Sequence, residues 1–262
     1  MKTKKIYTQE LYRQFGYLAT WNPGTPMALG DIGIMRQKQF TKIGNVSDLG
    51  ISFEIEEDIT PIDLEFSSEG AVSVSTKLSG SPTLAGSSLS DIDAGIHVKF
   101  SKENAILFKA NETRTPAIKN QIKLGEEIIE LFKAGKWDKN WVVITELVTA
   151  DSASILISSS KEASIDIKVS GEIGTNQLDI AEAELGLEVK FSKDLSTKFI
   201  AKTGLTPLFK VSKIKRPFLG TPIFKAKGIT SMDLATPQMA LEHNELFFFD
   251  KADFDFEEEV EM

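Results

Sequence analysis

Residues that could carry out catalysis or bind a metal ion are few in this chain of 262 residues. His97 and His243 are the only histidines, and neither has the spacing to further ligands that a zinc site requires. Adjacent acids such as Glu126 and Glu127 are typical of a solvated surface, not of a general acid and base. The chain has no cysteine, and it has no phosphate-loop, dinucleotide-binding or hydrolase motif. An enzyme is the least supported class, and we expect neither a cofactor nor a metal.

Basic side chains near the N-terminus have a chemistry that is easier to assign, because cations bind anionic lipid at about 1 kcal/mol each near a membrane surface. We predict a membrane-binding surface made of Lys2, Lys4, Lys5, Arg13, Arg36 and Lys38. The alternative is that these are ordinary solvated charges. Nucleic acid is not an expected partner, because no groove-reading motif occurs and the chain is not basic overall.

The acidic charge of the chain is concentrated in its last residues. The net charge is -8, and the stretch from Glu242 to Met262 holds nine acids and one lysine, so the remainder sums to zero. This tail also holds many phenylalanines for a purely solvating segment, namely Phe247, Phe248, Phe249, Phe254 and Phe256. We predict an autoinhibitory tail that adds as a strand to a sheet edge or fills a groove, with its acids near the basic N-terminal surface. The alternatives are a disordered solubility tail and a partner-docking peptide.

The elements that position these groups are indicated by an internal repeat. GIHVKFSK begins at residue 95 and GLEVKFSK begins at residue 186, 91 positions later. The same offset pairs Lys77 with Lys168 and Phe108 with Phe199, without a gap. An ungapped match over this length indicates a duplicated structural unit.

Each copy shows the strict alternation of apolar and polar residues that is typical of two strands joined by a turn. The alternating stretches run to about ten residues, the length with which a tilted strand crosses a bilayer. A charge on a lipid-facing position costs about 2–4 kcal/mol at the midplane, and the apolar face carries none. The alternative is a pair of hairpins folded permanently over a core. The predicted lipid-facing residues are Val72, Val74, Leu78, Ile96, Val98, Phe100, Ile165, Ile167, Val169, Leu185, Leu187, Val189 and Phe191.

Two further elements lie between and beside the copies. Apolar residues at roughly helical spacing, including Ile122 and Ile128, predict an amphipathic helix at about 117–134 that stops at Gly135. WVVITELV, residues 141–148, predicts a central, buried strand. The fold class that these patterns predict is α+β, with a twisted antiparallel sheet, two duplicated long hairpins and flanking helices.

This layout resembles the pore-forming N-terminal domain of the gasdermins, in which a basic N-terminal segment and a short hairpin precede two long hairpins separated by helical structure. GDIGIMRQKQFTKIGNVSDLGI, residues 30–51, resembles the first hairpin of that family, whose basic tip meets the membrane. WVVITELVTADSASILI and FIAKTGLTPLFKVSKIK resemble the strands that enter and leave the second long hairpin. The vertebrate members carry a large C-terminal repressor domain, which the residues after Lys215 are too few to form. The bacterial members are short and are restrained by a C-terminal peptide that a protease removes.

The resemblance implies a pore-forming domain over residues 1–216 and a C-terminal segment over residues 217–262. It implies a protein that is autoinhibited in solution and that permeabilises membranes after an activating protease removes the tail. The expected partners are an anionic membrane, that protease and further copies of the chain in a homo-oligomer. The inactive form is expected in the cytoplasm, since no signal peptide is apparent, and the active form at the cell inner membrane or plasma membrane. The alternative is a non-enzymatic β-rich binding or structural protein.

Overall fold

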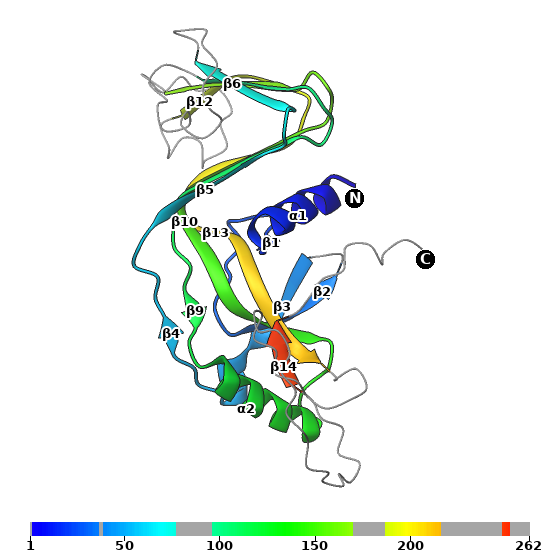
Figure 1. Ribbon diagram of the computed structural model, residues 1–262, viewed down its shortest axis with the longest axis vertical. Helices are drawn as coiled ribbons and strands as arrows, with labels where there is room; N and C mark the ends of the chain where they lie inside the picture. The colour runs from blue at the N-terminus through cyan, green and yellow to red at the C-terminus, as the bar shows by residue number, and fades with distance from the viewer. Residues whose placement is uncertain (1, 37–38, 77–95, 170–186, 216–247, 252–262) are drawn as a thin grey trace, which may run out of the picture.

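The computed structural model describes residues 2–36, 39–76, 96–169, 187–215 and 248–251 (Figure 1). Within them the strands form a ten-stranded sheet, here called the base sheet, and a four-stranded sheet, here called the tip sheet. Paired strands in both sheets run antiparallel. Together with the two α-helices this confirms the predicted α+β class.

The base sheet is built around two long strands, β10 (Trp141–Ser158) and β13 (Leu195–Lys215), which pair with each other along most of their length. WVVITELV lies in β10, and β10 also pairs with β2, β8 and β9, so the prediction of a central strand is confirmed. The other base strands are β1 (Leu18–Ala19), β2 (Asp31–Arg36), β3 (Gln39–Asn45), β4 (Ile55–Glu56), β5 (Ile62–Ser67), β8 (Ile106–Thr113), β9 (Ala117–Ile118) and β14 (Phe248–Lys251).

The tip sheet lies at one end of the molecule and contains part of each copy of the repeat (Figure 1). Its strands follow the order β12-β11-β7-β6, with bounds β6 (Val72–Thr76), β7 (Ile96–Phe100), β11 (Ser164–Val169) and β12 (Leu187–Lys193). Residues 96–100 of GIHVKFSK form β7, and residues 187–193 of GLEVKFSK form β12. Each of these strands is the returning arm of its hairpin. The two strands therefore have equivalent places within their hairpins, as predicted, but β7 is an inner strand of the tip sheet and β12 is an edge strand.

Two helices and a short 3-10 helix, η1 (Val46–Leu49), complete the described structure. Helix α1 (Lys2–Phe15) buries Tyr7 and Leu11 against strands of the base sheet, in a cluster with Phe108 and Leu208. Burying side chains of this size stabilises the fold by about 1.5–3 kcal/mol each. No helix in the described part of the chain is long and apolar enough to cross a membrane.

Helix α2 (Gln121–Lys133) lies at the end of the molecule opposite the tip sheet (Figure 1) and ends as predicted. Gly135 has a φ of 71°, and its N–H donates to the carbonyl of Phe132, while the N–H of Lys136 donates to the carbonyl of Leu131. These two bonds form a Schellman cap, for which glycine is the favoured residue. The buried face contains Leu124 and Ile128, but Ile122 is 76% exposed, so its predicted place on that face is wrong.

Candidate functional site

The tip sheet has one apolar and one polar face, as the alternation predicts. Val74, Val98, Phe100 and Ile165 are all at most 4% exposed and share a small cluster with Ala163 and with side chains of the base sheet. Val72 packs against the same cluster and is partly buried. The apolar face is therefore covered in this state of the protein. The structure shows a core role for these residues and leaves their contact with lipid a prediction.

The remaining predicted lipid-facing residues are less fully described. Six lie on strands of the tip sheet without a described side chain: Ile96, Ile167, Val169, Leu187, Val189 and Phe191. Leu78 and Leu185 lie outside the described residues.

The polar face of the tip sheet is where the two hairpins contact each other through charged side chains. His97 of β7 contacts Asp166 of β11 through its Nδ1 and the carboxylate Oδ1, and the two residues are register partners. Ser73 and Lys99 on this face are exposed. This contact between a histidine and a carboxylate joins two neighbouring strands of the tip sheet.

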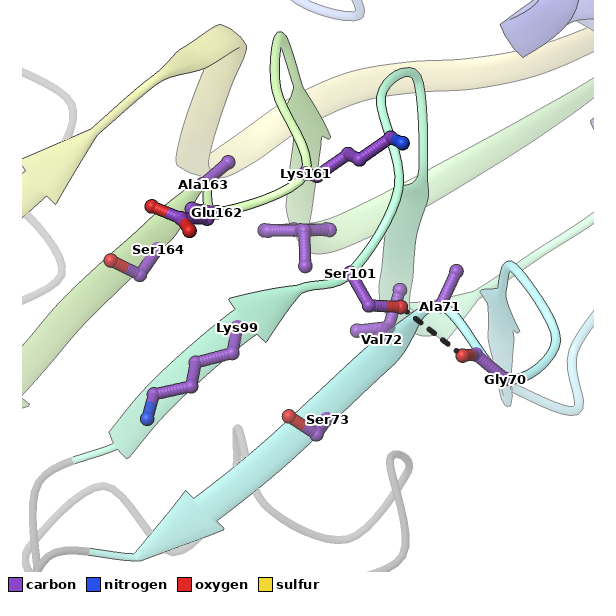
Figure 2. Close-up of a pocket in the computed structure, with 11 residues that line it drawn as sticks. Gly70, Ala71, Val72, Ser73, Lys99, Ser101, Lys161, Glu162, Ala163 and Ser164 are labelled. Atoms are coloured by element: carbon purple, nitrogen blue, oxygen red, sulfur yellow. Dashed lines mark hydrogen bonds between the residues drawn. The ribbon is translucent and has the colours of Figure 1, made fainter.

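A cavity of about 550 Å³ lies where the tip sheet meets the base sheet (Figure 2). It is lined by Gly70, Ser73, Lys99, Ser101, Lys161 and Glu162, among others, and the Ser101 hydroxyl donates to the Gly70 carbonyl at 3.3 Å. The residues lining it include no histidine, so the cavity lacks the usual group for proton transfer at neutral pH. Elsewhere in the described ranges no group of three or more histidines and acids is placed to hold a metal ion.

This cavity sits at a bend that divides each long hairpin in two. We call the corner the segments 68–71, 101–105 and 159–163 together with Asp194, which connect tip strands to base strands. Asn104 and Asp194 have φ angles of 60° and 54°, a region that residues other than glycine adopt mainly when they are Asn or Asp. The Thr3 hydroxyl donates to Asn104 Oδ1 at 2.7 Å, so the start of α1 is tied to the corner.

The end of α1 is tied to the long strands by a half-buried polar cluster. The Tyr17 hydroxyl donates to Glu146 Oε1 on β10, and Lys210 Nζ on β13 lies 2.9 and 3.0 Å from the two oxygens of that carboxylate. Lys210 Nζ also lies 3.9 Å from the centroid of the Tyr17 ring. Burial, with the Glu146 carboxylate beside it, raises the pKa of Tyr17 above its ordinary value.

The predicted membrane-binding cations are only partly gathered by the fold. Lys2 and Lys4 are exposed on α1, and Lys4 Nζ lies 4.9 Å from the centroid of the Trp21 ring. Arg13 is exposed at the other end of α1 beside Glu10, and Arg36 is exposed at the end of β2. Lys5 is partly buried, and Lys38 lies outside the described residues.

Lys42, on β3, joins this basic surface and was not predicted. A cavity of about 250 Å³ is lined by Lys4, Trp21, Gln39, Phe40 and Lys42, so α1 and the first hairpin meet there. Lys42 Nζ lies 2.8 Å from Oδ1 of the fully buried Asp31. The sequence shows Lys42 on a hairpin arm, but only the packing of α1 against that arm places it beside Lys4.

Part of the acidic tail lies on the edge of β13. Strand β14 pairs antiparallel with Ser212–Lys215, so that Phe249 lies opposite Ile214 and Asp250 lies opposite Lys213. It also contacts α2. Strand addition by the tail is therefore observed for Phe248 and Phe249, while Phe247, Phe254 and Phe256 lie outside the described residues.

The position of β14 differs from the predicted neighbourhood of the tail. It lies beside α2, away from α1 and its lysines (Figure 1). The described part of the tail therefore covers a sheet edge and does not cover the N-terminal cations. The reason is that backbone pairing along β13 provides hydrogen bonds that a cluster of exposed lysines does not.

The chain was compared with protein families, curated proteins and solved structures. No protein-family profile matches the chain, and no curated protein matches it. Its structure is similar to that of a bacterial gasdermin from Bradyrhizobium tropiciagri. The TM-score is 0.36 and the identity is 13%, over 80% of this chain and 86% of that one.

Proposed function

We propose that this chain is a gasdermin-like pore-forming protein that permeabilises membranes and that its own C-terminal tail holds inactive. The observation that carries the proposal is the tip sheet, whose two duplicated hairpins lie side by side with an apolar and a polar face. The described apolar face consists of Val72, Val74, Val98, Phe100 and Ile165, none of which is charged. A surface of this kind is suited to lipid once its covering side chains are removed.

The tail supports the inhibitory part of the proposal. An unpaired strand edge is a template for pairing with another chain, and the outer edge of β13 is covered by β14 at residues 212–215 and by β1 at Phe209 and Leu208. Each backbone hydrogen bond of β14 contributes about 0.5–1.5 kcal/mol. A four-residue strand held in this way stays in place while it is part of the chain, and it dissociates readily after cleavage because its effective concentration is lost.

The charge of the tail acts in the same direction. Removing the residues after Leu241 takes the net charge from -8 to zero, because the tail holds nine acids and one lysine. The repulsion between the protein and an anionic membrane then falls, and the exposed cations Lys2, Lys4 and Arg36 dominate the surface that approaches it. The active form in this proposal is a homo-oligomer at a cell membrane, produced by a protease.

Truncation at Leu241 tests the proposal with dye-loaded anionic liposomes. We expect the truncated chain to bind these vesicles and release their dye, most strongly at low salt, where charge screening is weakest. The full chain should leave the vesicles intact. Neutral phosphatidylcholine vesicles are the matched control. A truncated chain that stays monomeric and inert towards both would favour the other candidate function, a β-rich binding protein whose hairpins stay closed over the cluster around Val98 and Phe100.

A further inference from the structure

The line along which the two hairpins meet keeps one register from the base sheet into the tip sheet. In the base, Ile106 of β8 lies opposite Ile157 of β10. In the tip, Val98 of β7 lies opposite Ile165 of β11. The two pairs are eight positions apart on each strand, so the pairing register of the two strands does not change across the corner. We call this line, residues 96–111 against 152–167, the seam.

The corner itself holds to the same register. The Ser158 N–H donates to the Ala105 carbonyl at 3.0 Å, and the Phe100 N–H donates to the Ala163 carbonyl at 2.9 Å. Side chains close the seam at both ends. Asn111 Nδ2 donates to the Ser152 hydroxyl at 2.8 Å in the base, and His97 contacts Asp166 in the tip.

The outer strands behave differently. In the hairpin of the first repeat copy, Leu107 lies opposite Ser67 in the base sheet and Phe100 lies opposite Val72 in the tip sheet. Between these two pairs there are seven residue steps on the inner strand, which belongs to the seam, but only five on the outer strand. In the hairpin of the second repeat copy, Ile157 lies opposite Thr197 in the base sheet and Ser164 lies opposite Lys193 in the tip sheet. Between these two pairs there are seven residue steps on the inner strand and four on the outer strand. Both outer arms therefore change register at the corner, and the seam does not.

From this we infer that the seam is kept, pair for pair, when the hairpins insert into a membrane, and that the outer arms are the strands that slide. The inference rests on the proposed pore-forming function. Backbone groups that lose their partner in lipid cost several kcal/mol each, so a pairing that is already in its final register is retained. If the corner straightens, the outer strands must change their pairing with the inner strands, because they contain fewer residues than the inner strands between the same two pairs.

Straightening along the seam also gives each inner strand one consistent face. Residues an even number apart lie on the same side of a strand, so Val98 and Phe100 would continue into Ile106 and Phe108. Between them only Lys102 and Asn104 interrupt the row, and Lys102 falls opposite Lys161 when the seam register is extended through the corner. Both lysines are exposed now. They would stand at the level of anionic headgroups, so the corner marks the boundary of the lipid.

Engineered disulfides test the seam directly, since the chain has no cysteine. Register partners in antiparallel strands have Cα atoms roughly 4.5–5.5 Å apart, within the range that a disulfide spans. Two seam variants, His97→Cys with Asp166→Cys and Asn111→Cys with Ser152→Cys, are compared with an outer-arm variant, Ser73→Cys with Lys99→Cys. Each is truncated at Leu241, and its leakage of anionic liposomes is recorded oxidised and reduced.

For the seam variants, we expect the rate of dye release by the oxidised protein to lie within about two-fold of the rate by the reduced protein. For the outer-arm variant, we expect oxidation to lower the rate of dye release at least about ten-fold. Oxidised seam variants that are inert, while their reduced forms leak, would overturn the inference and leave the pore-forming function standing. An oxidised outer-arm variant as active as its reduced form would show that the outer arms do not slide. Reduced forms that all fail to leak would instead contradict the pore-forming function. Mass spectrometry and circular dichroism confirm the cross-link and the fold of each variant.

Discussion

His97 of β7 and Asp166 of β11 contact each other between the two copies of the repeat. At the 91-residue offset, His97 corresponds to Glu188 and Asp166 corresponds to Ser75. The contact is thus made by two positions at which the copies differ. The duplication supplies two similar hairpins, and their differences supply a polar contact that joins them side by side.

This contact should appear as a coupling free energy. The two side chains are 24% and 18% exposed, so the contact is partly shielded from water. We expect His97→Gln and Asp166→Asn each to lower the free energy of unfolding, and the double variant to lose about 1 kcal/mol less than the sum. Urea unfolding of the four proteins measures this coupling. Additive single effects would show that the contact does not hold the hairpins together.

Two of the three tyrosines should titrate late. Tyr7 is fully buried and its hydroxyl has no hydrogen-bond partner among the described residues, and burial raises its pKa above 10.0. The pKa of Tyr17 is raised by burial and by Glu146. The folded state then keeps protons that the unfolded state loses above its own pKa of about 10. Stability from these two phenols is complete below pH of about 10 and falls as the pH rises beyond it.

The phenolate absorbance during alkaline titration measures this effect. We expect the absorbance of Tyr7 and Tyr17 to appear only together with unfolding, and a variant with Tyr7→Phe and Tyr17→Phe to lack that late rise. Tyr7→Phe alone should cost little stability, because it removes a hydroxyl that has no partner. A late rise that persists in the double variant would place it on a different group.

Opposite faces of β12 should respond differently to a charge. Leu187→Lys puts a cation on the predicted apolar face, and Glu188→Lys puts one on the polar face, at adjacent positions of the same strand. In the truncated chain we expect Leu187→Lys to reduce liposome leakage sharply and Glu188→Lys to leave insertion intact, because a lipid-facing cation costs about 2–4 kcal/mol. Circular dichroism and urea unfolding check that both variants fold. Equal leakage would show that β12 does not face lipid.

The α1 lysines should matter more for membrane binding than lysines elsewhere. The variant Lys4→Gln with Lys5→Gln removes two cations near the first hairpin, and we expect anionic vesicle binding to weaken by about 2 kcal/mol, or roughly 30-fold. The matched control, Lys119→Gln with Lys123→Gln, removes two exposed cations at or near α2. Co-sedimentation with phosphatidylserine vesicles compares them, and equal losses would place the binding surface elsewhere.

Much of the fold follows from local sequence patterns. Alternation predicted the tip strands, because one side of a strand faces a core and the other faces water, as Val98 and Lys99 show. The helix predicted at about 117–134 with a stop at Gly135 is present as α2, although it begins only at Gln121, because residues 117–118 pair with β4 and β10 as strand β9. The hairpin at residues 30–51 and the strand at residues 199–215 are present as β2–β3 and within β13.

The corner could not be predicted in the same way. Its left-handed residues are Gly70, Asn104 and Asp194, and two of these three are not the glycine or proline that marks most sharp bends. The bend is stabilised by contacts between distant segments, such as Thr3 with Asn104 and the pairing of Ala105 with Ser158. The alternation therefore predicted continuous hairpins where the structure divides each of them between two sheets.

For the candidate site, the sequence predicted which kinds of side chain take part better than it predicted where they lie in the fold. The tail was expected either to add as a strand or to fill a groove, and its described part adds as a strand to β13, beside α2, an edge that the sequence does not place next to it. Lys42 escaped prediction because its neighbour Lys4 is far away in the chain. Charge and aromatic content indicate that a segment packs against another surface, and only the tertiary structure shows which surface that is.

In the proposed function, the tail on β13 keeps the protein from permeabilising membranes. The most direct measurement places a specific protease site between residues 216 and 247 and records dye release from anionic liposomes before and after cleavage of one sample. The protein carries Lys213→Cys and Asp250→Cys, which are register partners of β13 and β14. We predict no release before cleavage, none after cleavage while the disulfide holds the tail, and rapid release once the disulfide is reduced. Release that is already complete with the tail cross-linked, or none after cleavage and reduction, would contradict the account.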